Sequence, residues 1–287
     1  MSWTNYHSHC HYCDGKMPPE DHIMEAIRQN IKIFGFSSHC PVPFQNSWSI
    51  KLENFQAYLS EIDGLKEKFA GQIELYKSLE VDFIPDVISI HSDLIKNANL
   101  NYTVGSVHFV GQFENSDWWE IDGTTTRFKE GLSSIYHDDI QQVVKDYFSN
   151  IRKMVQEACP EIIGHLDKIK MHNGKEYFFD ENDDWYQKEL LATLEEIKSS
   201  HAIIEVNTRG MYKKYTTEPY PGKIALHAIN KLGIPVCINS DSHHPSEITK
   251  CFPETAGLLQ TIGFKNLRIF RNKEWVDVGF NSAGLDF

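Results

Sequence analysis

The chain has 287 residues, of which 41% are hydrophobic and 24% are charged. These fractions are close to the average for folded domains, so they exclude a disordered or fibrous chain. The formal net charge of -12 argues against a nucleic-acid partner, because binding to a phosphate backbone normally requires a basic surface. A small anionic substrate stays compatible with this charge, since bound divalent ions would dominate the local field.

The first residues contain no basic stretch followed by an apolar run and a cleavage site, which a signal peptide would need. No segment approaches the roughly 18 uninterrupted apolar residues of a membrane-spanning helix. We therefore expect a cytoplasmic protein without a membrane partner, and the sequence says nothing about its oligomeric state.

Short apolar runs alternate with longer amphipathic stretches from the N-terminus onwards, which predicts a parallel sheet with helical crossovers. The predicted strands are, in chain order, 3–7, 33–37, 73–79, 102–107, 161–164, 202–206 and 234–239, with a further extended run at 267–270. The predicted helices are 18–31, 52–69, 85–97, 138–158, 183–199, 221–232 and 246–260. This alternation indicates an α/β fold.

Two segments depart from the alternation. Residues 111–137 are polar and rich in Trp, Asp, Gly and Thr, and long irregular loops of this kind are often functional. We expect a substrate-facing lid there, with a plain surface loop as the alternative. Residues 281–287 resemble a loosely held C-terminal tail, and no linker divides residues 1–280, which we treat as one domain.

Metal-binding side chains follow the predicted strands. His7 and His9 end the first strand. The later strands are followed by His39, Glu80, His108, His165, and the pair Asp241 and His243. In (β/α) barrels the C-terminal ends of the strands meet at one opening, so we expect these side chains to be neighbours. Imidazole and carboxylate ligands suit Zn, Fe or Mn, and a carboxylate can bridge two ions, so two or more ions are expected.

Together with Asp14, this series resembles the polymerase and histidinol phosphatase (PHP) family over nearly the whole chain, and most of all its monofunctional histidinol-phosphate phosphatases. The motifs that carry the resemblance are His7-x-His9, Ser78-Leu79-Glu80-Val81-Asp82, Gly105-Ser106-Val107-His108, Gly164-His165-Leu166-Asp167, Glu205-Val206-Asn207-Thr208 and Asn239-Ser240-Asp241-Ser242-His243.

The resemblance implies a distorted seven-stranded (β/α) barrel of the TIM-like type and a site for three divalent ions. One ion would be held by His7, His9, Glu80 and Asp241, a second by Glu80, His108 and His165, and a third by Asp14, His39 and His243. Many PHP proteins have a histidine at the position of Asp14, so the third site is expected to bind more weakly or to prefer a harder metal.

The implied reaction is hydrolysis of a phosphate monoester, specifically L-histidinol phosphate in histidine biosynthesis. Bound ions lower the pKa of a shared water and neutralise phosphoryl charge, and phosphoryl transfer needs little beyond such positioning. Glu80 and Asp241 are the predicted catalytic residues, and Asp241 could also relay a proton. Arg209 is the candidate phosphate contact, because a guanidinium can bind two phosphate oxygens. By resemblance, Trp118 and Asp122 would contact the imidazole and ammonium groups of the substrate.

Other functions stay open at this point. A metal-dependent amidohydrolase also begins with HxH, but it commonly bridges its metals with a carbamylated lysine, whereas Glu80 takes that place here. A PHP phosphoesterase acting on nucleotides and a non-enzymatic metal-binding module are further alternatives. A structural zinc site at Cys10 and Cys13 is disfavoured, because no second CxxC is present.

Overall fold

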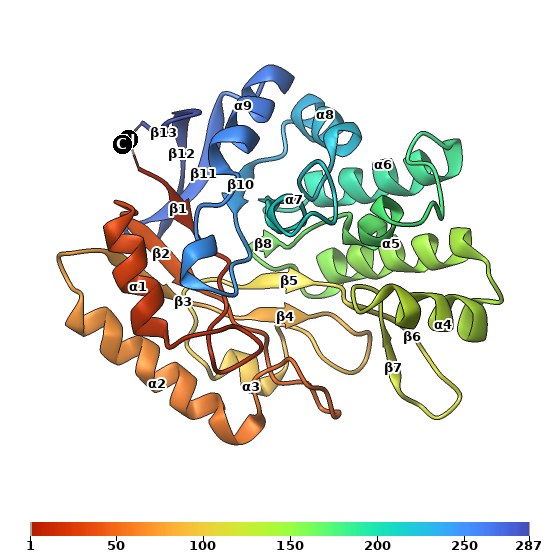
Figure 1. Cartoon of the computed structure of the whole chain (residues 1–287), viewed down its shortest axis with the longest axis horizontal. Helices are drawn as coiled ribbons and strands as arrows, with labels where there is room; N and C mark the ends of the chain where they lie inside the picture. Colours follow the sequence, from red (N-terminus) through yellow and green to blue (C-terminus); the bar gives the residue numbers. More distant parts are fainter. Residues whose placement is uncertain (1, 287) are drawn as a thin grey trace.

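The computed structural model describes residues 2–286 as a mixed α/β fold, which confirms the predicted class. Short strands lie at the centre and the longer helices surround them (Figure 1). No helix among residues 2–286 is long and apolar enough to cross a membrane.

Two parallel sheets form the centre of the molecule, and their strands match all seven predicted central strands. The smaller sheet has the order β1-β2-β3 and contains β1 (Thr4–Asn5), β2 (Ile33–Phe36) and β3 (Glu74–Lys77). The larger sheet has the order β10-β9-β8-β5-β4 and contains β4 (Glu80–Asp82), β5 (Val104–Ser106), β8 (Ile162–Ile163), β9 (Ile203–Asn207) and β10 (Val236–Asn239). The predicted strand 73–79 corresponds to β3, and the chain then continues into β4, a further strand that belongs to the other sheet.

The edges of the two sheets approach each other without forming a continuous ladder. Isolated parallel bridges join Ser8 to Ser242 and His39 to Glu80. Within the described residues, the pairing therefore does not run unbroken around a closed ring of seven strands. Ser8, His39 and Ser242 follow the C-terminal ends of β1, β2 and β10, and Glu80 is the first residue of β4, shortly after β3. Both links therefore lie where the metal-binding side chains are predicted.

Amphipathic helices cover the outside of the strands. Each of the longer ones has buried residues at helical spacing, as in the run Val143, Val144, Tyr147, Phe148 and Ile151 of α5. The helices are α1 (Pro19–Arg28), α2 (Leu52–Lys68), α3 (Asp93–Lys96), α4 (Thr125–Tyr136), α5 (Ile140–Glu157), α6 (Asp184–Lys198), α7 (Arg209–Tyr212), α8 (Lys223–Leu232) and α9 (Phe252–Ile262), with 3-10 turns η1 (Lys168–Gly174) and η2 (Pro245–Glu247).

The prediction that residues 111–137 are irregular is wrong. This segment contains the end of the hairpin β6 (Phe109–Gln112) and β7 (Trp118–Glu120), followed by α4. The side chain of Thr124 caps α4 by accepting a hydrogen bond from the Arg127 amide at 3.1 Å. Gly131 lets α4 lie directly on the indole of Trp119, because a Cβ at this glycine would be 2.1 Å from that ring. Tertiary packing therefore overrides the weak helix propensity of the Gly and Ser residues in α4.

Two other segments differ from the prediction. The expected helix over 85–97 is reduced to the four residues of α3, since Asp86 has a positive φ of 62° and an Ile84–Ile88 bridge closes a turn. The expected helix over 246–260 begins later, at Phe252, and runs to Ile262.

The loosely held tail predicted at 281–287 is also wrong for the part that the structure describes. The run at 267–270 becomes β11 (Asn266–Arg271), which pairs antiparallel with β12 (Glu274–Asn281), and β12 pairs in turn with β13 (Gly284–Leu285). Leu285 is 2% exposed and its amide donates to the carbonyl of Ser2 at 2.9 Å. The C-terminal hairpin therefore packs on the strands and fixes both ends of the chain to the same part of the fold (Figure 1).

Candidate metal centre

All nine predicted metal ligands lie together at the C-terminal ends of the parallel strands. Three groups have ligand atoms within 4.8 Å of one another: His7, His9 and Asp241; His39, Glu80 and His108; and His9, Asp14, His39 and His243. The remaining predicted ligand, His165, has its Nε2 atom 3.1 Å from Nε2 of His108. The strand ends therefore bring together side chains that are up to 236 residues apart, from His7 to His243.

Glu80 occupies the centre of these groups. Its Oε2 atom is 3.2 Å from His7 Nε2, 3.5 Å from His9 Nε2 and 2.9 Å from His39 Nδ1. Its Oε1 atom is 2.9 Å from His165 Nε2 and 3.6 Å from His108 Nε2. The two oxygens of one carboxylate thus face two different sets of histidines, which is the arrangement that a bridging ligand needs.

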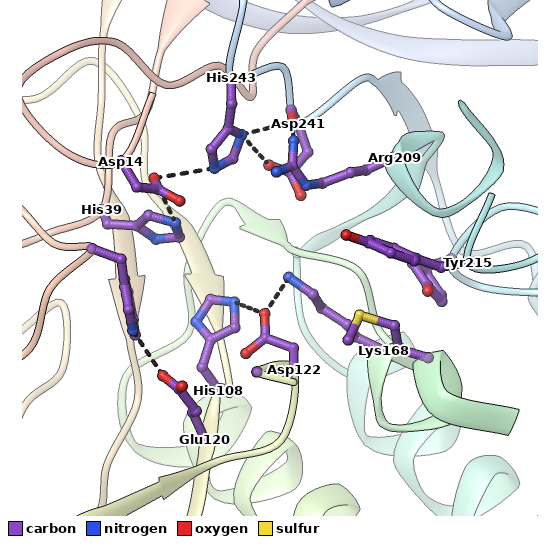
Figure 2. Close-up of a pocket in the computed structure, with 14 residues that line it drawn as sticks. Asp14, His39, His108, Glu120, Asp122, Lys168, Arg209, Tyr215, Asp241 and His243 are labelled. Atoms are coloured by element: carbon purple, nitrogen blue, oxygen red, sulfur yellow. Dashed lines mark hydrogen bonds and ion pairs between the residues drawn. The ribbon is translucent and has the colours of Figure 1, made fainter. Parts of the chain in front are cut away.

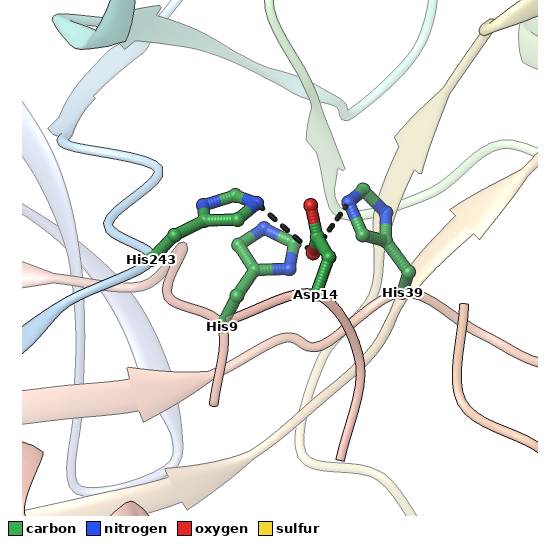
Figure 3. Close-up of side chains that lie close together, drawn as sticks. All are labelled: His9, Asp14, His39 and His243. Atoms are coloured by element: carbon green, nitrogen blue, oxygen red, sulfur yellow. Dashed lines mark ion pairs between the residues drawn. The ribbon is translucent and has the colours of Figure 1, made fainter. Parts of the chain in front are cut away.

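Asp14 is the ligand that comes from a loop rather than a strand end. Figure 3 shows its carboxylate between the rings of His39 and His243, with Oδ1 at 3.7 Å and 3.2 Å from their Nε2 atoms. The backbone holds this loop in place, because the Asp14 amide donates to the Trp48 carbonyl at 3.0 Å. Gly15 is required next to it, since a Cβ there would be 2.5 Å from the Cys10 amide nitrogen.

The nitrogen and oxygen atoms at the centre are better arranged to bind metal ions than to form hydrogen bonds with one another. Among the described residues, several buried polar atoms have no hydrogen-bond partner, and those at this centre are His7 Nε2, His9 Nε2, Asp14 Oδ1, His39 Nδ1 and Glu80 Oε2. Buried polar atoms in folded proteins are nearly always satisfied. Divalent cations would satisfy these atoms, because imidazole nitrogens and carboxylate oxygens are ligands of Zn, Fe and Mn.

Buried carboxylates orient two of the histidines by binding the ring nitrogen that faces away from the centre. Glu205 Oε1 accepts from His7 Nδ1 at 2.7 Å, and Asp82 Oδ1 accepts from His108 Nδ1 at 2.8 Å. Each contact turns the Nε2 atom of the histidine toward the centre, as such partners do in metalloproteins. Asp241 has a φ of 51°, a left-handed conformation that is costly for a non-glycine residue and is often found at functional sites.

The side chains by themselves favour the ligand form at Glu80 and His9, whereas neighbouring carboxylates outweigh burial and raise the pKa of His7 and of His108. Burial alone would raise the pKa of Glu80, but His7, His39 and His108 hold it well below its usual range. Burial, reinforced by His243 and His39, lowers the pKa of His9 well below its usual value. Glu80 is therefore ionised and His9 neutral near pH 7, as metal coordination requires.

A cavity of about 190 Å³ opens onto this centre, and two basic side chains line it. Arg209, at the start of α7, lines it and donates from Nη1 to the Asp241 carbonyl at 2.9 Å. Lys168, at the start of η1, lines it as well, and its Nζ atom is 2.7 Å from Asp122 Oδ2. Figure 2 shows both basic side chains directed into the cavity beside Asp241 and Asp122. Arg209 and Asp122 thus both line the cavity, and their contact with a substrate stays a prediction.

Trp118 does not lie at this cavity. It lines an adjoining hollow with Phe44 and Phe109, which Trp48 and Glu120 also line, and its ring centroid is 5.8 Å from that of Phe44. The tryptophan that does line the cavity is Trp48, which the sequence analysis did not single out. It lies in the loop after His39, where nothing in the sequence marks it as different from a surface aromatic residue.

Other site residues were missed although the sequence contained a signal for them. Asp82 lies two residues after Glu80, and Glu205 two residues before Asn207, so each pair occupies one face of a strand. Asn207 Nδ2 donates to Glu205 Oε2 at 2.9 Å and to Asp241 Oδ2 at 3.2 Å. His11 and His244, which lie next to the ligand motifs, are exposed.

The chain is similar in sequence to a known family and to two of the proteins named histidinol-phosphatases. The model of the PHP domain family matches residues 5–209. A probable histidinol-phosphatase of Schizosaccharomyces pombe is 27% identical over 279 residues, which cover 91% of this chain and 87% of that protein. A probable histidinol-phosphatase of Deinococcus radiodurans is 24% identical over 258 residues, covering 89% of this chain and 91% of its own.

A solved structure has the same fold. The histidinol phosphate phosphatase of Lactococcus lactis, complexed with Zn, L-histidinol and phosphate, superposes with a TM-score of 0.71 at 20% identity and covers 100% of this chain and 99% of its own. The likeness therefore extends beyond residue 209 to the strand and loop that carry Asp241 and His243.

Proposed function

The chain belongs to the PHP domain family, and from this premise we propose that it is a metal-dependent phosphatase that hydrolyses L-histidinol phosphate to L-histidinol and phosphate. The observation that carries the proposal is the convergence of nine metal-binding side chains on a cavity that also contains Arg209 and Lys168. Relatives that span most of this chain are named histidinol-phosphatases, and this identifies the organic part of the substrate.

We propose three ions at this centre. His7, His9, Glu80 and Asp241 would hold the first, Glu80, His108 and His165 the second, and Asp14, His39 and His243 the third. The three groups of close ligand atoms support this division, although His9 and His39 each lie near two groups. When bound, such ions lower the pKa of a coordinated water and neutralise charge on the phosphoryl oxygens.

The residues of the chain hold these donors in position. Ser106 Oγ donates to Glu80 Oε1 at 2.6 Å, and Asn207 Nδ2 donates to Asp241 Oδ2 at 3.2 Å. Each carboxylate therefore has one anchored oxygen, while Glu80 Oε2 has no hydrogen-bond partner among the described residues. Asp241 Oδ1 is 3.2 Å from His9 Nε2, so Asp241 is also placed to accept a proton at the centre of the site.

Arg209 and Lys168 are the proposed phosphate contacts. Arg209 uses Nη1 to bind the Asp241 carbonyl and the Tyr212 hydroxyl, at 2.9 and 3.4 Å. A guanidinium carries five N–H donors, so others stay available for two phosphoryl oxygens. Lys168 would supply a second positive charge, and its pair with Asp122 fixes its direction.

The proposal also covers the domain organisation of the chain and the location of the enzyme. The single domain expected for residues 1–280 extends through β12 and β13 to Leu285, and we treat the two parallel sheets as parts of one distorted seven-stranded barrel interrupted at the isolated bridges. The proposed enzyme is cytoplasmic and does not bind nucleic acid, which the net charge of -12 supports.

The test is phosphate release from L-histidinol phosphate, measured beside a nucleoside monophosphate, an amide and a lactone. We expect turnover of the first compound, loss of turnover after dialysis against a chelator, and recovery on addition of Zn or Mn. Glu80→Gln should abolish turnover and lower the metal content of the purified protein. Full activity of metal-free protein, or turnover of the amide alone, would refute the proposal.

A further inference from the structure

Besides predicted metal ligands, the cavity is lined by the basic side chains of Arg209 and Lys168 and by the carboxylates of Asp122 and Glu120. Glu120 lies across the cavity from Arg209 (Figure 2). Asp122 is already paired with Lys168 at 2.7 Å. Glu120, by contrast, forms no ion pair with any residue in the described range 2–286, and its contact at 2.9 Å is with the neutral indole N–H of Trp48.

The position of Glu120 is fixed from both sides. Trp48 Nε1 donates to its Oε2 atom. On the other side lies Gly123, where a Cβ would be 2.7 Å from Glu120 Oε1, so this glycine leaves the room that the carboxylate occupies. A carboxylate that is held in a cavity without a cationic partner is a site for a cation supplied by the ligand.

Trp48 is itself a rigid support. Its ring stacks on Phe109 with centroids 5.6 Å apart and an interplanar angle of 15°. It also packs edge-on against the metal ligand His39, with centroids 4.5 Å apart. The loop that carries Trp48 is closed by Asn46, whose Oδ1 atom accepts from the Trp48 amide at 3.1 Å. The distance of Glu120 from the metal centre is therefore set by packing rather than by a flexible side chain.

We infer that Glu120, positioned by Trp48, is the residue that selects phosphate monoesters with a positively charged organic part. The phosphoryl group would face the metal centre and Arg209, and the ammonium or imidazolium group of the ester would bind Glu120. This inference rests on the proposed phosphatase function and names the substrate class of the same site. Trp118, which was expected to make such a contact, lines only the adjoining hollow, on the other side of Trp48 and Glu120, which line both.

The inference is tested with two esters of the same shape and different charge. L-Histidinol phosphate carries an ammonium and an imidazole group, whereas 3-phenylpropyl phosphate has the same chain length and an aromatic ring without positive charge. Glu120→Gln keeps the acceptor for Trp48 and removes the charge. We expect it to lower the ratio of kcat/KM for the charged ester over the neutral ester by about ten- to a hundred-fold, mainly through KM, because a hydrogen bond to a charged group contributes this much.

Two further variants complete the experiment. Trp48→Phe removes the indole N–H, and we expect it to lower the same ratio by less than Glu120→Gln does. Asp117→Asn removes an exposed carboxylate of the neighbouring turn, which bonds to Asn115 at 2.7 Å, and it should leave the ratio unchanged. Metal content and melting temperature are measured for each variant, so that a folding defect is recognised.

The outcomes separate this inference from the proposed function. If Glu120→Gln reduces turnover of both esters equally, or of neither, Glu120 does not read the charge and the inference fails while the phosphatase function stands. If the unmodified protein hydrolyses neither ester, the proposed function itself fails.

Discussion

Replacing Glu205 by glutamine tests whether the carboxylates behind the ligands determine metal binding. Glu205 is fully buried and accepts four hydrogen bonds. Its Oε1 atom accepts from His7 Nδ1 at 2.7 Å and from Asn239 Nδ2 at 3.0 Å, while Oε2 accepts from the His165 amide and from Asn207 Nδ2, both at 2.9 Å. Every contact of this side chain is with a donor, so both oxygens are needed.

The expected loss of stability follows from the number of hydrogen bonds that Glu205 accepts. A glutamine presents one oxygen and one NH2 group, so two of the four donors lose their acceptor whichever way the amide is turned. An unsatisfied buried donor costs about 1–3 kcal/mol, which gives about 2–6 kcal/mol for the pair. If the NH2 group faces His7, that histidine regains a partner only by moving its proton to Nε2, which removes a ligand atom. Loss of such an orienting contact lowers metal affinity by about 10–100-fold.

The measurement is metal content after dialysis against a chelator of known affinity, together with urea denaturation of the metal-free protein. Glu205→Gln should lose metal at a lower chelator concentration than the unmodified protein and should also be less stable without metal. Glu254→Gln, on an exposed position of α9, serves as the control and should change neither quantity. Equal metal retention by Glu205→Gln and the unmodified protein would refute the reasoning.

Other predictions concern single contacts. Asp14→Ala should lower the metal content by one ion per chain, because this carboxylate supplies the third group with its only oxygen ligand; an unchanged content by elemental analysis would show that the histidines alone hold that ion. Gly131→Ala should destabilise the fold by about 1–3 kcal/mol through overpacking against Trp119, seen as a lower urea midpoint, and an unchanged midpoint would contradict the close contact of α4 with this ring. Leu285→Ala should cost about 2–5 kcal/mol in the same assay, whereas a value near zero would mean that the C-terminal hairpin does not stabilise the core.

The sequence could predict that most of the proposed ligands lie together, because their positions follow a local rule. A residue directly after a buried parallel strand lies at the C-terminal edge of the sheet, so His108 after β5 and His165 after β8 could be assigned to one site without any knowledge of the intervening helices. Asp14 was assigned by resemblance alone, since it lies in a loop whose path depends on contacts with Trp48 and His243.

The hairpin and α4 could not be predicted in the same way. The segment 111–137 is polar, and its helix is stabilised by Phe128 and Leu132 packing beneath Trp119 rather than by intrinsic propensity. The roles of Trp48 and Glu120 depend on the resulting approach of two loops, which brings an indole N–H from one to a carboxylate of the other. Contacts between loops have no periodic signal in the sequence, so they were the part of the site that the sequence analysis missed.

The positions of the residues that orient the ligands, in contrast, can be predicted from the sequence. Alternate residues of a strand share one face, and at this centre the second residue of such a pair reaches a ligand on the neighbouring strand. Asp82 on β4 holds His108 after β5, and Asn207 on β9 holds Asp241 after β10. A carboxylate or amide at the last position of one strand is therefore informative about the ligand of the next strand. These hydrogen bonds between neighbouring strands explain why side chains just beyond a strand end are held rigidly. We therefore expect Asp82→Asn to weaken metal binding through His108 without removing any predicted metal ligand.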